Sequence, residues 1–417
     1  MLVHICDNKL VSVLQIIANF IEIGWIIYYF FPVYYLFQRE TRFISFIKKK
    51  QYIIFHQLYT YYYYIVTFYH LYIYQFTLKN MKKIPLLGLL VVLNISCSTQ
   101  KISKENSDPT KYMKTITADE LKTHLYIVAS DEMEGRETGS AGQKKAGVYL
   151  IDQYKKNEIP FPTGASDYYQ KIPAAFLNAK RNENLSNSEN IWAYIEGSEK
   201  PNEVLVISAH YDHVGTKNGE IYNGADDDGS GTVALLEIAQ AFQIAKKEGH
   251  GPKRSVLFLH VTGEEHGLHG SRYYSENPLF PLANTITDIN IDMIGRRDEA
   301  HISSNNYVYV IGANRLSTDL DNICTTANAT YTKLDLDYKY NDPKDPNHFY
   351  ERSDHYNFAK NGVPSVFLFN GVHADYHKPT DSPDKIEYDA LTKRAQFAFV
   401  TAWELANRRE RPVVDKK

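Results

Sequence analysis

Cysteine is scarce in this chain. Of the 417 residues only three are cysteine, Cys6, Cys97 and Cys324, and they lie far apart. This number and spacing exclude a disulfide framework and a zinc site built from thiolates. The formal net charge is −3, so the chain lacks the excess of positive charge that binds nucleic acid. We therefore expect no nucleic-acid partner, and any metal ion must be bound by His, Asp or Glu.

Residues 1–80 lack small residues, with one Gly, one Ala and one Asp, and are crowded with Tyr, Ile and Phe. One interpretation is a hydrophobic membrane anchor, because 10–37 is long and largely apolar. Gln15, Asn19 and Glu22 interrupt that stretch, however. The other interpretation is a translation start assigned too far upstream in AT-rich DNA. The next methionine, Met81, favours the second.

Residues 81–97 form a positively charged start followed by a short apolar run, "MKKIPLLGLLVVLNISC". This stretch resembles a bacterial lipoprotein signal, with Cys97 as the lipidated first residue. Asn94 stands where an aliphatic residue is usual, so cleavage without lipidation stays open. Residues 98–111 are polar and predict a tether. We expect an exported protein of the bacterial cell envelope, periplasmic or an outer-membrane lipoprotein, held to the membrane by the lipid or by the N-terminal hydrophobic segment.

From residue 112 onward the pattern alternates between strands and helices. The strands have continuous apolar runs, which indicates a sheet buried on both faces. This predicts an α/β protein with one catalytic domain over 112–412. The expected strands are 191–195, 204–209, 255–261, 287–292, 307–311 and 364–369, and the expected helices are 117–130, 141–156, 230–247, 315–328 and 386–408.

Several of these strands end in residues that bind metals. "HYDHVG" follows 204–209, "TGEEHG" follows 255–260, and "INID" ends at Asp292. "NGADDDGSG" at 223–231 places three aspartates before a helix, and "GVHADYHK" supplies His373 and His377. Ligands of open α/β sheets bind beyond the carboxyl ends of the strands. Each motif alone fits an ordinary turn, but oxygen and imidazole donors at four strand exits together predict a zinc centre. We expect the remaining histidines, His213, His260, His266, His269 and His355, to be loop or packing residues.

The motif series also resembles a known family. "SAHYDHVG", "GADDDGSG", "TGEEHGLHGS", "INIDMIG", "RSDHYNFAKNGVPSVFLF" and "DYHKPTDSPDKI" are similar, in this order, to the bacterial di-zinc aminopeptidases of metallopeptidase family twenty-eight. The similarity runs from about residue 129 to the C-terminal helix. It implies a three-layer α/β/α sandwich with a mixed, mostly parallel central sheet, two zinc ions per chain, and peptide substrates with a free N-terminus.

The resemblance assigns the zinc ligands by matching positions. His210 and Asp292 would bind one zinc ion, Glu265 and His377 would bind the other, and Asp227 would bridge the two. In family members the peptide bond after this bridging aspartate is often cis.

Three further roles follow from the resemblance. Asp212 would accept the second ring N–H of His210 and so orient it. Glu264 would be the general base that takes a proton from a metal-bridging hydroxide or water and returns it to the leaving amine. Tyr376 would donate a hydrogen bond to the carbonyl oxygen.

Two other functions remain open. A glutaminyl cyclase, an acyltransferase with a single zinc on a related fold, shares "HYD" and the paired glutamates but lacks the intact "DDDGSG". A non-catalytic binding domain on the same fold would have lost metal ligands, whereas all five are present here. Carboxypeptidase or dipeptidase specificity also stays open.

Overall fold

The computed structural model describes residues 108–180 and 183–416. They belong to one compact unit, Gln100–Lys417. The upstream segment 1–80, the signal-like stretch 81–97 and most of the tether at 98–111 lie outside the described residues. Within the described part, no helix is both long and apolar enough to cross a lipid bilayer.

The centre of the unit is an eight-stranded sheet with the order β1-β2-β6-β3-β7-β10-β8-β9. Its middle strands β6, β3, β7 and β10 all run parallel to one another. The pairs β1–β2, β2–β6 and β10–β8 are antiparallel, and β8–β9 is parallel. The bounds are β1 Tyr169–Ile172, β2 Ser188–Ile195, β3 Lys200–His210, β6 Arg254–Val261, β7 Thr285–Ile291, β8 Tyr307–Ile311, β9 Asp335–Asp337 and β10 Ser365–Phe369.

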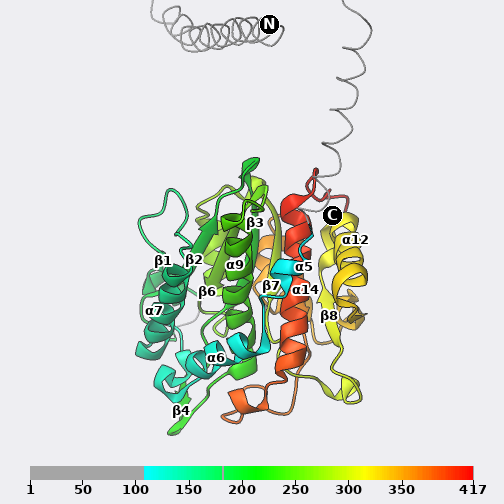
Figure 1. The fold of residues 1–417 in the computed structure, drawn as a ribbon. Coiled ribbons are helices and arrows are strands. Elements are labelled where there is room, and N and C mark those ends of the chain that lie inside the picture. The colour runs from blue at the N-terminus through cyan, green and yellow to red at the C-terminus, as the bar shows by residue number, and fades with distance from the viewer. Residues whose placement is uncertain (1–107, 181–182, 417) are drawn as a thin grey trace, which may run out of the picture. The chain divides into compact units, whose positions relative to one another are not determined.

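Both faces of the sheet are covered, because the central strands bury side chains in both directions. Leu205 and Ile207 of β3 belong to the larger core, whereas Val204 and Val206 belong to a second core on the opposite face. The larger core packs under the helices in front of the sheet in Figure 1: α5 Thr110–Met113, α6 Ala118–Val128, α7 Ala141–Lys156, α9 Gly231–Lys247, α12 Thr318–Ala327 and α14 Tyr388–Asn407.

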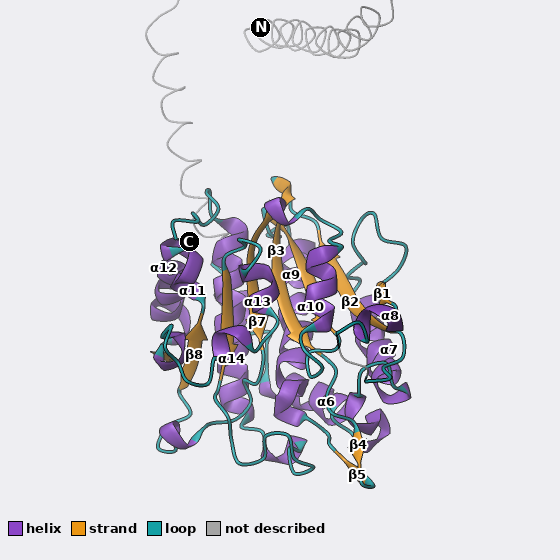
Figure 2. Ribbon diagram, turned by 180° about the vertical axis from the view of Figure 1, so that it is seen from behind, coloured by secondary structure: helices purple, strands orange, loops and turns teal. Residues whose placement is uncertain are grey.

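On the other face, α10 (His269–Glu276) and α13 (His355–Ala359) cover the sheet, as Figure 2 shows. Tyr274 of α10 and Phe358 of α13 fill the second core. The three-layer α/β/α sandwich with a mixed, mostly parallel sheet is thus confirmed.

All six expected strands and the long helices are present, with ends that differ by a few residues. The expected helix 315–328 is divided, because Ser317 caps α12 by accepting a hydrogen bond from the Leu320 N–H at 3.1 Å. A separate short helix, α11 (Ala313–Leu316), precedes it. At the start of α6 the Thr117 side chain accepts from the Glu120 N–H at 3.3 Å, as the capping motif predicts.

The elements that the sequence did not predict are short. Among them are the strands β1, β9 and the hairpin strands β4 (Thr216–Lys217) and β5 (Glu220–Ile221), and the helices α5, α8 (Ala174–Leu177), α10 and α13. A strand of two to four residues carries too few alternations for a period to be recognised.

A buried arginine holds the segment that leads to the three aspartates. Arg136 is fully buried and donates hydrogen bonds to four backbone carbonyl groups at 2.7–2.9 Å, those of Val128, Tyr211, Asn223 and Gly224. These carbonyls belong to the end of α6, the exit of β3 and the loop before Ala225. One guanidinium group therefore fixes the exit of β3 relative to the aspartate turn.

Candidate metal centre

The four parallel strands bring the predicted ligands to one edge of the sheet. His210 is the last residue of β3, and Asp292 directly follows the neighbouring strand β7. Glu265 follows β6 by a short turn, and His377 lies in the segment after β10. Because parallel strands end at the same edge, residues far apart in the sequence meet there.

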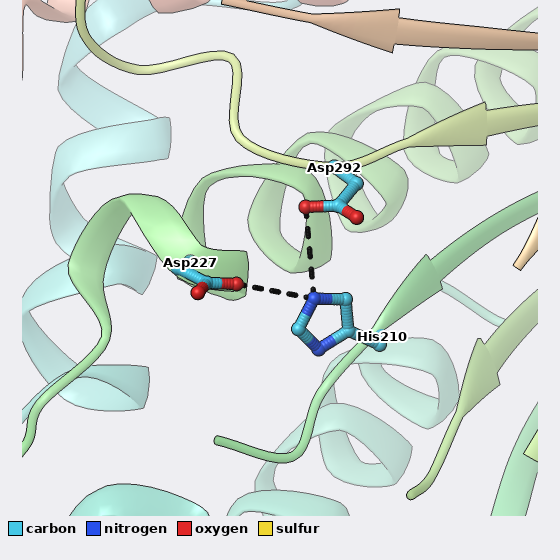
Figure 3. A group of neighbouring side chains, drawn as sticks. All are labelled: His210, Asp227 and Asp292. Carbon is cyan, nitrogen blue, oxygen red and sulfur yellow. Dashed lines mark ion pairs between the residues drawn. The ribbon is translucent and has the colours of Figure 1, made fainter. Parts of the chain in front are cut away.

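A first group of donor atoms surrounds His210 (Figure 3). Its Nε2 lies 3.2 Å from Asp227 Oδ1 and 3.6 Å from Asp292 Oδ1. The three residues come from the end of β3, the aspartate turn and the exit of β7. Their ligand atoms all lie within 4.8 Å of one another, close enough for one metal ion.

A second group shares Asp227 with the first. His377 Nε2 lies 2.9 Å from Asp227 Oδ2 and 3.0 Å from Glu265 Oε2. The two oxygens of Asp227 thus face different histidines. The structure brings all five predicted ligands together, with Asp227 between the two groups.

The three consecutive aspartates point in different directions. Asp226 accepts the Gly295 N–H at 2.6 Å. Asp228 accepts the N–H groups of His210, Gly231 and Met293 at 2.8–3.2 Å. Both outer carboxylates therefore hold the surrounding backbone, and the second oxygen of Asp226 lies 3.1 Å from His373 Nε2. Of the three, Asp227 faces both His210 and His377. The peptide bond between Asp227 and Asp228 is cis.

Several donor atoms at this centre are buried without a hydrogen bond. His210 Nε2, Asp227 Oδ2 and Glu265 Oε1 have no hydrogen-bond partner among the described residues. Buried polar atoms are normally hydrogen-bonded. Burial lowers the pKa of His210, but the carboxylates of Asp292 and Asp227 outweigh it and hold that pKa well above its usual range. Unpaired donors and excess negative charge fit a site for cations, and nitrogen and oxygen donors without thiolates suit zinc.

The orientation of the His210 ring is set by its other nitrogen. Its Nδ1 lies 3.1 Å from the backbone carbonyl oxygen of Asp212, and a carbonyl can only accept. Nδ1 therefore carries a hydrogen, and Nε2 is the nitrogen that faces Asp227 and Asp292 and could bind a metal ion.

This corrects the predicted role of Asp212. We expected its carboxylate to accept the His210 N–H, but Oδ1 lies 3.8 Å from Nδ1. The carboxylate accepts instead from the Thr138 hydroxyl at 2.8 Å and from the Glu264 N–H at 3.2 Å. Asp212 thus orients His210 through its main chain and Glu264 through its side chain.

Asp292 also has a hydrogen-bonded support that sequence reasoning missed. The Ser353 hydroxyl donates to Asp292 Oδ2 at 2.5 Å, and Ser353 Oγ accepts from Asn290 Nδ2 at 2.6 Å. This leaves Asp292 Oδ1 directed at His210. Ser353 lies in the motif "RSDHYNF" that the sequence analysis singled out. Its hydrogen bond to Asp292 could be recognised only from the fold.

Glu264 lies beside the two groups without belonging to either. Burial, together with the negative charges of Glu265, Asp292 and Asp354, raises the pKa of its carboxyl group well above the usual range. A carboxylate with a raised pKa is a better proton acceptor near neutral pH.

Comparison with known proteins agrees with this geometry. The model of Peptidase family M28 matches residues 190–402, just over half of the chain. The chain belongs to peptidase family M28.

Relatives and solved structures of this M28 chain were also found. It is 28% identical over 235 residues to a probable leucine aminopeptidase of Arthroderma otae, a match that covers 55% of this chain and 60% of that protein. The chain thus spans about three fifths of that curated relative. The LapA aminopeptidase of Legionella pneumophila has a similar fold, with a TM-score of 0.56 at 21% identity over 72% of this chain and 75% of LapA. The zinc aminopeptidase BSAP of Bacillus subtilis gives 0.53 at 16% identity over 70% of this chain and 96% of BSAP.

Tyr376 lies against the centre of the M28 chain. Its ring stacks on the ring of His377 with centroids 4.0 Å apart, and its hydroxyl is 3.4 Å from Arg352 Nη2. Burial and the charges of Asp227 and Glu265 raise its pKa. The hydroxyl therefore keeps its proton and remains a hydrogen-bond donor.

Sequence reasoning missed one histidine of the centre. His213 was expected to be a loop or packing residue, yet its Nδ1 lies 2.7 Å from Glu265 Oε1. The ligand atoms of His213, Asp227 and Glu265 all lie within 4.8 Å of one another, so His213 stands with the second group around a possible metal ion. The sequence feature that could have identified His213 is its position in "HYDHVG", three residues after His210 at the end of the same strand.

Proposed function

We propose that this M28 chain is a zinc-dependent aminopeptidase that holds two zinc ions and hydrolyses the first peptide bond of peptides with a free N-terminus. The observation that carries the proposal is the position of Asp227, whose Oδ1 faces His210 and whose Oδ2 faces His377. A carboxylate shared by two donor groups is the arrangement of a two-metal hydrolase.

His210, Asp292 and Asp227 would hold one zinc ion, and Glu265, His377 and Asp227 the other. When bound, these ions would acidify a water molecule and polarise the scissile carbonyl group.

The remaining steps fall to side chains of the protein. The Glu264 carboxylate takes the proton of the attacking water and passes it to the amine that leaves. The Tyr376 hydroxyl donates a hydrogen bond to the carbonyl oxygen as negative charge develops on it. The carboxylates at the centre attract the free amino group of the peptide, which favours cleavage at the first peptide bond.

The first experiment is elemental analysis of purified 98–417 after dialysis, together with hydrolysis of aminoacyl anilides. We expect close to two zinc ions per chain, loss of hydrolysis when a chelator removes them, and recovery when zinc is returned. One tightly held zinc ion with cyclisation of N-terminal glutamine would support the glutaminyl cyclase instead. No zinc, even after addition, would contradict both enzymes and favour a binding domain.

We also propose that the protein is exported to the cell envelope and anchored by a lipid on Cys97. The support is the charged, then apolar, stretch that ends at this cysteine. Labelling of cells with palmitate is expected to tag the wild-type protein and not a Cys97→Ser variant. Equal label in both would contradict lipidation, and recovery of an unlabelled wild-type protein in the soluble periplasmic fraction would indicate cleavage alone.

A further inference from the structure

The ring of His213 is held in a fixed position beside the second donor group. The residue is fully buried, and its backbone N–H donates to the Arg136 carbonyl oxygen at 3.1 Å. Gly224 forms the wall behind the ring, where an added Cβ atom would lie 2.5 Å from His213 Cδ2 and Cγ. Only glycine leaves this space, so the loop before the aspartates is shaped around the imidazole.

The Nδ1 edge of this ring faces two predicted ligands. His213 Nδ1 lies 2.7 Å from Glu265 Oε1 and 3.8 Å from Asp227 Oδ2. All three atoms are buried and lack a hydrogen-bond partner among the described residues, so even the short contact does not have hydrogen-bond geometry. His210 Nε2, a predicted ligand, shows the same combination of close carboxylate oxygens and no hydrogen bond. The ligand atoms of His213, Asp227 and Glu265 all lie within 4.8 Å of one another, close enough for one metal ion.

The same two carboxylates face His377 from another direction. The four contacts of Glu265 and Asp227 with the two imidazoles span 2.7–3.8 Å. Zinc–nitrogen and zinc–oxygen bonds of about 2.0–2.1 Å in a tetrahedral site separate adjacent donors by roughly 3.3 Å. Two carboxylates and two imidazoles at such separations match the donor set of one four-coordinate zinc ion.

We propose that His213 Nδ1 is a fourth protein ligand of the second zinc ion, with Asp227, Glu265 and His377. This inference rests on the proposed two-zinc function. With His213 as a ligand, the two zinc positions are unequal. The second has four protein ligands, and the first has three, His210, Asp227 and Asp292. Sites with four protein ligands hold zinc tightly, whereas sites with three keep a position open. The first ion should therefore exchange more readily than the second.

The test is zinc binding in chelator competition by the wild type, His213→Ala and His213→Asn. We expect His213→Ala to bind the second ion at least about 100-fold more weakly, more than the 10–100-fold typical of outer-sphere partners, and to bind the other ion as the wild type does. Asparagine can supply an N–H near the Nδ1 position but is a poor zinc ligand, so His213→Asn should lose the ion as well. Wild-type affinity in either variant would overturn the proposal. In particular, rescue by His213→Asn alone would mean that the imidazole only donates a hydrogen bond to Glu265.

A matched control removes another buried imidazole. His260 on β6 is fully buried and contacts the Tyr154 hydroxyl at 2.7 Å. His260→Asn should retain both zinc ions with wild-type affinity. An equal loss of zinc in this control would show that the effect of His213→Ala is a general weakening of the fold, and would overturn the ligand assignment.

A zinc-loaded crystal structure of the wild type decides the question even if the variants fold poorly. Anomalous scattering at the zinc edge should place an ion about 2.0–2.1 Å from His213 Nδ1. An ion bound to Glu265 and His377 but more than about 3 Å from that nitrogen would overturn the inference while leaving the two-zinc function intact. A wild-type protein that binds no zinc would instead overturn the proposed function itself.

Discussion

Replacement of Glu264 by glutamine is expected to leave both zinc ions bound and to lower kcat by about 10²–10⁴-fold. The glutamine side chain has nearly the same shape but cannot accept a proton from water. Because Glu264 stands outside both donor groups, its loss should not weaken zinc binding. The measurement is kcat on an aminoacyl anilide together with zinc content by elemental analysis.

Glu220→Gln is the matched control, because Glu220 is an exposed residue of β5. It should keep wild-type kcat and zinc content. If Glu264→Gln kept most of its activity, Glu264 would not be the general base. If it lost zinc along with activity, Glu264 would be a ligand rather than a base.

Replacement of Asp227 by alanine should remove both zinc ions and lower activity by about 10³-fold or more. Asp227 is the one residue common to both donor groups, so no substitution elsewhere should affect the two positions equally. Zinc content and kcat should both fall to near the values of the wild type in chelator. Thermal unfolding in chelator, where neither protein holds zinc, checks that the variant is folded.

Variants of the unshared ligands provide the comparison. Asp292→Ala and Glu265→Ala should each retain about one zinc ion per chain, since each leaves one group complete. If Asp227→Ala also retained one ion, the bridging assignment would be wrong. If Glu265→Ala lost both, the two positions would be occupied only together.

The core strands were predictable because their pattern is local. Strands 204–209 and 255–261 contain the apolar runs "VLVI" and "VLFL", and the side chains of β3 and β6 are buried on both faces of the sheet. The edge strands β1 and β9 were missed, since their four and three residues take their conformation from the neighbour they pair with. The hydrogen bond from Ser353 to Asp292 could not be predicted either, because it joins two segments that lie 61 residues apart in the sequence.

Motif chemistry showed which residue types could form a metal centre, and the family pattern indicated Asp227 among three consecutive aspartates. The fold explains why the other two differ: both oxygens of Asp228 accept backbone N–H groups, whereas Asp226 accepts one through Oδ1 and faces His373 with Oδ2. The hydrogen-bond acceptor for His210 Nδ1 was predicted to be the Asp212 carboxylate, but it is the Asp212 carbonyl oxygen. Sequence spacing placed a carboxylate two residues after His210, but only the path of the chain beyond β3 decides that the carbonyl oxygen lies closer.

By itself the sequence determined the fold class, the metal-binding character of the strand ends and the motif order typical of the M28 family, because these depend on short-range pattern and residue chemistry. The tertiary structure alone decided which donor atoms meet, which oxygen of Asp227 faces which histidine and that the His213 ring faces the second group. The physical reason is that a metal centre of this kind is built from the ends of separate parallel strands, whose distances are set by sheet register and packing and leave no mark on local sequence.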